Sequence, residues 1–332
     1  MSLEAPPHPR AVFEFLSDGD GERAFLASLE RGRLHHAWLL TGPEGVGKAT
    51  FAYRAARRLL GATPVPGRGV LGADPDDPVS RQIMARAHPD LLVLQREQED
   101  GKPRRNIPVD EARELPEFFS KSPAIAPYRV AIIDAADDLN INAANAVLKT
   151  LEEPPARGVL LLISHAPAAL LPTIRSRCRT LRFAAPDPTA AAAWVADRAD
   201  VGLADAGRLL TMARGAPGQA LRLAAAKALE IDSIAVGILE RLPSTDEAAL
   251  LALADSFRGP AGMARFQLFF DRLAQRAHAH AVLELDDGQQ RVSARWAEAW
   301  SALVDLPRRA EAVNLDRADV LYTAIARLKA IA

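Results

Sequence analysis

The chain has 332 residues, of which 49% are hydrophobic and 25% are charged, and its formal net charge is -1. This composition is typical of soluble globular proteins, and the length predicts two or three domains. The near-zero net charge excludes a global basic field for nucleic acid or anionic membranes, so such contact would need a local patch. The single cysteine, Cys178, excludes an internal disulfide and any metal site built from several cysteines. No apolar run is long enough to cross a bilayer, and the N-terminal MSLEAPPHPR lacks the apolar core of a signal peptide, so we expect a cytoplasmic protein without membrane contact.

Hydrophobic periodicity predicts a helix over residues 21–33, followed by a buried strand at AWLL (37–40). A glycine-rich loop comes next, and alanines and leucines between residues 52 and 60 mark the inner face of a second helix. Residues 61–80 are rich in Gly, Pro and Asp, which predicts an irregular loop.

Four further apolar runs predict buried strands at residues 91–94, 130–133, 159–163 and 181–183. Helical patterns separate most of these runs, and the one from Ile141 to Leu151 is stopped by Pro154 and Pro155. Buried strands that alternate with helices predict a parallel sheet with both faces covered.

Strand patterns stop after residue 188. Short helical patterns occupy residues 189–226, and longer amphipathic helices follow from about residue 235. We therefore predict three domains: an α/β domain at residues 1–185, a small helical domain at 186–232 and a helical C-terminal domain at 233–332.

The glycine-rich loop, TGPEGVGKAT (41–50), has the G-x4-G-K spacing of a phosphate-binding loop. Backbone N–H groups, the start of the following helix and the Lys48 ammonium would together bind a phosphate. The Ser or Thr that normally holds magnesium is Ala49 here, and the hydroxyl comes one position late, at Thr50. The loop is therefore either a nucleotide site or an inherited loop that is kept for its shape. With the aspartate described next, the candidate nucleotide-binding residues are Gly42, Gly45, Gly47, Lys48, Thr50 and Asp134.

Asp134 ends an apolar run at the point where phosphate-loop NTPases place the aspartate that holds magnesium. ATPases of this group that hydrolyse briskly usually carry Glu at the next position, which is Ala135 here. Asp137 lies three residues further on, so we expect it to point elsewhere. The alternative role for Asp134 is to cap the turn after its strand.

Two arginines, Arg175 and Arg177, precede the last strand in LLPTIRSRC (170–178). An arginine displayed at a domain edge can reach the γ-phosphate bound to a neighbouring subunit and stabilise transition-state charge there. The alternative is a surface salt bridge. Cys178 is most simply a small buried hydrophobic residue.

A basic loop, GKPRRNIP (101–108), carries Lys102, Arg104 and Arg105. These side chains would contact DNA phosphates or remain a solvated loop. No aromatic residues are interleaved with them for stacking on single strands.

Five motifs, in their order and spacing, resemble the delta-prime subunit family of the bacterial DNA polymerase III clamp loader, which belongs to the AAA+ ATPases. The motifs are HHAWLLTGPEGVGKAT, HPDLLVL, VAIIDAADDLNINAANAVLKTLEEPP, LLPTIRSRC and GAPGQAL. The resemblance covers roughly residues 20–225. It implies an α/β phosphate-loop domain of the RecA-like AAA+ class with a parallel sheet, a small helical lid domain and an all-α C-terminal collar domain.

The resemblance also implies roles for single residues. Arg177 matches the arginine finger that completes the ATP site of an adjacent motor subunit. Lys48 matches the phosphate-loop lysine, and Asp134 matches the magnesium aspartate. Ser164 falls near the position of the family's polar sensor at a strand end. Gln219 falls where hydrolysing relatives carry a sensing arginine, in a G-x-x-R-x-A-L pattern.

Three residues depart from that pattern, because Ala49, Ala135 and Gln219 each replace a group that an active site would use. These losses agree with the usual description of delta-prime subunits as inactive ATPases. Many relatives carry a four-cysteine zinc module after the phosphate-loop helix, but this chain has no cysteine there, so we expect neither zinc nor another resident metal. Weak or vestigial binding of ATP and magnesium stays open.

The function that the resemblance implies is a non-hydrolysing scaffold subunit of the DNA polymerase III holoenzyme, itself neither a polymerase nor an efficient ATPase. Its implied partners are motor and delta subunits, the sliding clamp and primed DNA. Two alternatives stay open. The first is a self-sufficient AAA+ motor, which a hydroxyl residue after Lys48 and a Glu after Asp134 would have favoured. Both are missing here. A phosphate-loop kinase for small molecules would leave the long helical C-terminal region unexplained.

Overall fold

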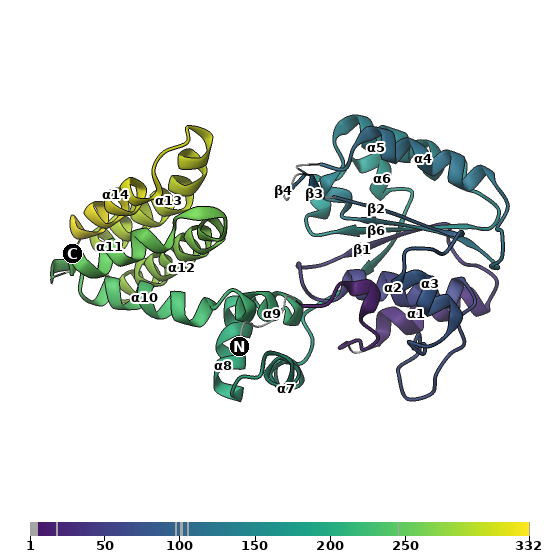
Figure 1. Cartoon of the computed structure of the whole chain (residues 1–332), viewed down its shortest axis with the longest axis horizontal. Helices are drawn as coiled ribbons and strands as arrows, with labels where there is room; N and C mark the ends of the chain where they lie inside the picture. Colours follow the sequence, from purple (N-terminus) through teal and green to yellow (C-terminus); the bar gives the residue numbers. More distant parts are fainter. Residues whose placement is uncertain are drawn as a thin grey trace. The chain divides into compact units, whose positions relative to one another are not determined.

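A computed structural model describes residues 6–17, 19–96, 98–99, 102–104, 106–244 and 246–331 of the chain (Figure 1). The chain forms two compact units, residues 1–222 and residues 223–332, and each is described by itself. The predicted three-domain division is finer than these units and stays a prediction.

A five-stranded parallel sheet forms the centre of the first unit, with the strand order β2-β5-β6-β1-β7. The strands are β1 (Ala37–Thr41), β2 (Leu91–Gln95), β5 (Arg129–Asp134), β6 (Gly158–Ser164) and β7 (Arg179–Arg182). All five predicted strands are confirmed, although the last begins two residues earlier than the apolar pattern indicated. Two short strands, β3 (Gln98–Glu99) and β4 (Lys102–Pro103), form a separate antiparallel pair.

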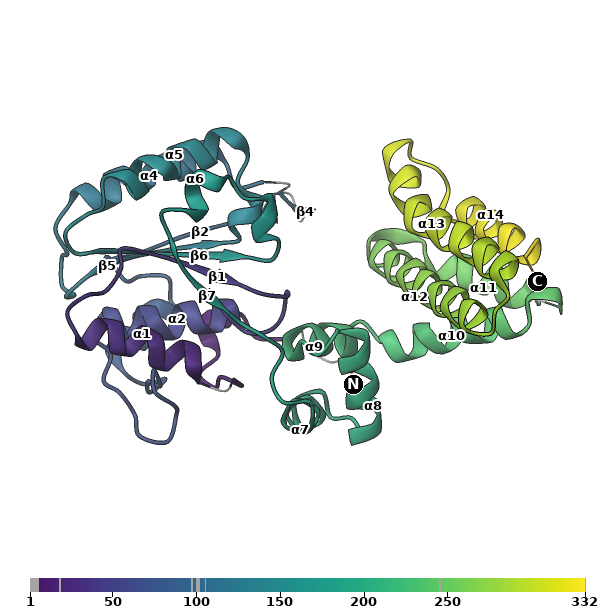
Figure 2. The same ribbon diagram turned by 180° about the vertical axis from the view of Figure 1, so that it is seen from behind.

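Helices cover both faces of the sheet, as its continuous apolar strands require. One face carries α1 (Asp20–Glu30), α2 (Lys48–Leu59) and α3 (Pro78–Met84), and the other carries α4 (Val109–Ser120), α5 (Ile141–Glu152) and α6 (Pro172–Arg175) (Figures 1 and 2). Two buried clusters fill the layers, one around Trp38 and Phe51 and the other around Leu39 and Ile133.

The irregular loop predicted for residues 61–80 ends earlier than expected, because α3 begins at Pro78. The Asp77 side chain accepts a hydrogen bond from the Val79 amide and caps this helix. Proline suits the first turn of a helix, where its missing N–H has no partner to lose. The Asp-Pro pair at residues 77–78 was therefore the sequence signal for the start of this helix.

Three short helices follow the sheet: α7 (Pro188–Ala199), α8 (Leu203–Met212) and α9 (Pro217–Ala225). Asp187 caps α7 through the Ala190 amide, and Asp200 ends it in the left-handed conformation. These helices confirm the small helical region expected after the sheet. Short 3-10 turns occupy Pro9–Ala11, Ala136–Asp138, Pro167–Ala169 and Leu242–Ser244.

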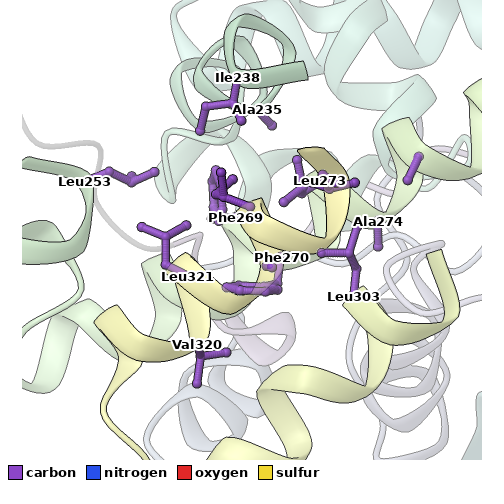
Figure 3. Packing of buried hydrophobic residues seen from close by; sticks show 14 of the residues in the cluster. Ala235, Ile238, Leu253, Phe269, Phe270, Leu273, Ala274, Leu303, Val320 and Leu321 are labelled. Carbon is purple, nitrogen blue, oxygen red and sulfur yellow. The ribbon is translucent and has the colours of Figure 1, made fainter. Parts of the chain in front are cut away.

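The second unit is all helical, as predicted. Its helices are α10 (Ala228–Glu240), α11 (Glu247–Ser256), α12 (Gly259–Asp286), α13 (Gln290–Ala312) and α14 (Arg317–Lys329). Phenylalanines of α12, including Phe269 and Phe270, pack against Leu303 of α13 and Leu321 of α14 in its core (Figure 3). Within the described ranges, no helix combines the length and the apolar character needed to cross a membrane.

Candidate functional site

The phosphate-binding loop lies between β1 and α2, which is the position the sequence predicted. Lys48 is 3% exposed, and its Nζ donates to the carbonyl oxygens of Gly42 and Pro43, both at 2.6 Å. These bonds direct the ammonium toward the loop's own backbone. The lysine therefore satisfies the loop itself, where a phosphate-binding lysine would offer its donors to a ligand.

Helix α9 packs directly on this loop. The Gly218 amide donates to the Gly45 carbonyl at 2.9 Å, and a methyl group built on Gly45 would lie 2.5 Å from the Gln219 nitrogen. Arg222 Nη2 forms an ion pair with Glu44 Oε1 at 2.9 Å, and Arg222 Nε donates to Gln219 Oε1 at 2.9 Å. The Gln219 amide is therefore already engaged with its own helix.

The residue at the position of the sensing arginine is Gly218, and the assignment of Gln219 to that position was wrong by one residue. Counted from Gly215, the arginine of the G-x-x-R-x-A-L pattern falls on Gly218, one residue before Gln219. Gly218 is the residue that contacts Gly45 through its backbone, and a methyl group built on it would lie 2.9 Å from the Gly45 oxygen. A side chain at residue 218 would therefore push α9 away from the loop.

The N-terminal segment covers another part of the loop. A methyl group built on Gly47 would lie 2.8 Å from the ring of Phe15, and that ring packs near Phe51 and Phe183. The buried Arg54 of α2 holds this segment by donating to the carbonyl oxygen of Phe13. The loop is thus in contact with chain atoms from both the N-terminal segment and α9.

Asp134 ends β5 as predicted and lies in the electrostatic field of Lys48. Burial raises the pKa of Asp134 to about 6, while the nearby ammonium opposes that shift. Burial lowers the pKa of Lys48 to about 8, against the opposing charges of Glu44 and Asp134. Both shifts have the same main cause, because burial withdraws the two charged groups from water.

The carboxylate of Asp137 is hydrogen-bonded to the C-terminal end of β6. Its carboxylate accepts hydrogen bonds from the Ser164 hydroxyl at 2.9 Å, the His165 amide at 2.7 Å and the Ala166 amide at 3.1 Å. Ser164, the sensor-like residue, is fully buried and donates its hydroxyl proton to this partner. The hydroxyl is therefore committed within the chain.

Arg177 lies in the turn between α6 and β7, and its side chain is 36% exposed. Its Nη2 forms an ion pair with Glu152 Oε1 at 3.0 Å, and its Nη1 donates to the Thr173 carbonyl at 3.1 Å. The neighbouring Arg175 is exposed. Cys178 is half-buried, and burial raises its pKa to about 12, which disfavours the thiolate form.

Three features of the loop differ from a standard magnesium-nucleotide site, and binding of ATP and magnesium stays a prediction. Lys48 is bound to carbonyl oxygens, Ala49 brings a partly buried methyl group to the position of the magnesium hydroxyl, and Thr50 lies one residue further along α2. Among the residues that the structure describes, no group of three or more His, Cys, Asp or Glu side chains could hold a metal ion.

The basic loop gives little support for a DNA contact. Arg104 pairs with Glu111 at 3.1 Å. Arg105 lies outside the described residues, and only the backbone of Lys102 is described. The predicted role of this loop therefore stays a prediction.

Known proteins similar to the chain identify its family. Residues 20–187 match the sequence family described as "DNA polymerase III, delta subunit". DNA polymerase III subunit delta' of Escherichia coli (strain K12) is 30% identical over 263 residues, which are 79% of this chain and 76% of that protein. The chain belongs to the delta-prime subunit family of the DNA polymerase III clamp loader. The sheet order and the helices that follow it form the AAA+ architecture that the family resemblance implied.

Two further proteins are similar to parts of the chain. DNA polymerase III subunit delta' of Pseudomonas aeruginosa is 40% identical over 196 residues, which are 58% of this chain and 57% of that protein. The chain thus spans less than two thirds of this relative. The solved structure of a DNA polymerase III gamma subunit-related protein from Thermotoga maritima has a TM-score of 0.47 and 19% identity, and the match covers 92% of this chain and 99% of that one.

Sequence reasoning missed the contacts that close the phosphate loop. Arg222 stands one helical turn after Gln219, and this i, i+3 spacing was a signal that the two side chains would meet. Its pairing with Glu44 joins segments far apart in the sequence, so no local pattern indicated it. The role of Phe15 was equally hidden, because it lies in a segment without regular structure.

Proposed function

We propose that the chain is a non-hydrolysing scaffold subunit of a clamp loader, and that Arg177 acts as an arginine finger in a neighbouring subunit's ATP site. The partners proposed are ATP-hydrolysing motor subunits, a delta subunit, a sliding clamp and primed DNA. The helical second unit would join the subunits into a ring, and the assembled ring would open the clamp and place it on DNA.

The observation that carries this proposal is a contrast within one unit. The chain's own phosphate loop has its lysine bound to the Gly42 and Pro43 carbonyls, while the side chain of Arg177 is 36% exposed. Arginine donates through five N–H groups and stays charged, so an exposed guanidinium is suited to bind a phosphate on another molecule. The closed loop and Ala135 speak against the alternative of a self-sufficient motor.

The deciding experiment replaces Arg177 by alanine in a clamp loader reconstituted from the subunits of the same organism. The DNA- and clamp-stimulated ATPase should fall by about tenfold or more at the affected site, because transition-state charge on the γ-phosphate loses its partner. Size-exclusion chromatography should show an intact complex. Arg175→Ala is the matched control and should hydrolyse ATP at the unaltered rate.

Unchanged turnover in Arg177→Ala would overturn the finger role. A second experiment tests the scaffold role by measuring phosphate release from magnesium ATP by the isolated chain. The expected result is no multiple-turnover release. Turnover by the isolated chain at the rate of a motor subunit would support the self-sufficient ATPase instead.

A further inference from the structure

We propose that Glu152 is a positioning residue for Arg177, an inference that rests on the finger role proposed above. Glu152 is the last residue of α5, and Arg177 follows the end of α6. The two meet at 3.0 Å between Glu152 Oε1 and Arg177 Nη2, while the Thr173 carbonyl accepts from Nη1 at 3.1 Å. One guanidinium is therefore held from two sides by two helices.

The position of Glu152 points to this partner. A carboxylate at the C-terminal end of a helix is unfavourable, because the last carbonyl groups carry partial negative charge. The helix therefore gains nothing from a glutamate at this place, and the guanidinium charge of Arg177 offsets its cost. The pair is also partly exposed, with side chains 36% and 53% accessible, so it contributes little to the stability of the fold.

The geometry leaves Arg177 able to bind phosphate while it is held. The two contacts use one N–H of each terminal nitrogen, and a guanidinium carries five such donors in one plane. The remaining N–H groups of the guanidinium do not bond to Glu152 or Thr173. Holding the plane before the neighbouring nucleotide arrives reduces the conformational entropy lost when the finger engages. Glu152 thus acts on catalysis through Arg177, without touching the phosphate itself.

The test uses the reconstituted clamp loader and measures kcat and KM for ATP. Glu152→Ala should lower kcat by about two- to fivefold, the range that a partly exposed ion pair can supply, and should leave KM within about twofold. Glu152→Gln keeps an oxygen that can accept from Nη2, so it should recover part of the loss. Glu153→Ala, which removes the adjacent exposed carboxylate, is the matched control and should behave as the parent complex.

A double variant separates positioning from a general structural role. In an Arg177→Ala background, Glu152→Ala should have no further effect on kcat, because its target is absent. If Arg177→Ala is impaired and Glu152→Ala is not, the positioning role is wrong and the finger stands. If Arg177→Ala is itself unimpaired, the proposed function fails. A rise in kcat with Glu152→Ala would also overturn the inference, since it would show that the carboxylate competes with the phosphate.

Discussion

The Gly218 amide donates to the Gly45 carbonyl at 2.9 Å, which joins the start of α9 to the middle of the phosphate-binding loop. A methyl group built on Gly45 would lie 2.5 Å from the Gln219 nitrogen, and one built on Gly218 would lie 2.9 Å from the Gly45 oxygen, so neither position has room for a side chain. The ion pair between Arg222 and Glu44 lies one helical turn further along α9. The loop therefore serves here as a packing surface for the helix that follows the sheet.

A side chain at residue 45 should break this packing. Gly45→Ala places a methyl group 2.5 Å from the Gln219 nitrogen, and the residue has a φ of +82°. The left-handed backbone costs about 1 to 2 kcal/mol for an L-residue, and the overlap with backbone adds about 1 to 3 kcal/mol. We expect the first unit to lose roughly 2 to 5 kcal/mol of unfolding free energy, measured by native-state hydrogen exchange of β1 and β6 amides.

Gly67→Ala is the control for this variant. Gly67 has a similar φ of +88°, but a methyl group built on it meets no atom within 4 Å. This variant should lose only the backbone contribution, about 1 to 2 kcal/mol. Equal losses in the two variants would show that α9 does not press on the loop.

The Asp134 carboxyl should make stability depend on pH between about 4 and 6. Burial raises its folded pKa from the ordinary value of 3.8 to about 6, so the folded state binds the proton more tightly than the unfolded state. Stability from this group is therefore fully present below about pH 4 and is lost as the pH rises through 6. Relative to Asp134→Asn, the parent should lose about 1 to 2 kcal/mol across this window, a value reduced for the partial exposure of the side chain.

Hydrogen exchange or urea unfolding at a series of pH values from 4 to 7.5 measures this difference. Asp110→Asn changes a carboxylate that is 84% exposed in the same unit, so its stability should follow that of the parent at every pH. A constant difference between the parent and Asp134→Asn across the window would contradict the raised pKa.

The sheet could be predicted from the sequence because its strands are buried on both faces. Runs such as VAII and VLLLI have no polar residue to interrupt them, and they lie in β5 and β6. The phosphate loop could be predicted because its G-x4-G-K sequence lies between a strand pattern and a helix pattern. Arg177 was singled out through the motif around it, and its finger role stays a prediction.

The state of the candidate site could not be predicted. Spacing shows that Lys48 follows a glycine loop, but it does not show whether the ammonium faces a ligand or the carbonyls of Gly42 and Pro43. The contacts of α9 and the N-terminal segment with the loop join residues far apart in the sequence, so no local pattern indicated them. Likewise, Asp137 was expected to point away from a magnesium site, but its three bonds to the end of β6 arise from the register of two neighbouring strands.

The buried ion pair between Arg54 and Glu22 should be important for the first unit. Their side chains are 3% and 5% exposed, Arg54 Nε lies 2.6 Å from Glu22 Oε1, and Arg54 Nη2 donates to the Arg68 carbonyl at 2.7 Å. Glu22→Gln leaves a buried guanidinium without its counter-charge, so we expect a loss of about 3 to 5 kcal/mol. Hydrogen exchange of α2 amides measures it.

Asp20→Asn supplies the comparison, because Asp20 and Arg23 are paired on the surface with side chains 79% and 57% exposed. Such a pair contributes about 0 to 1 kcal/mol. If Glu22→Gln were as mild as this variant, the buried pair would not hold α1 and α2 together.

The loop between α2 and α3 should keep its structure without a metal. Asp77 accepts from the Val79 amide at 2.9 Å and from the Thr63 amide at 3.2 Å, which closes the loop onto the start of α3. Asp77→Ala removes both bonds and should cost about 1 to 2 kcal/mol, whereas Asp76→Ala at the exposed neighbouring position should cost little. A metal chelator should leave the Tm of the parent unchanged, because these bonds come from the chain itself. A fall in Tm on adding chelator, reversed by zinc, would show that a metal holds this loop instead.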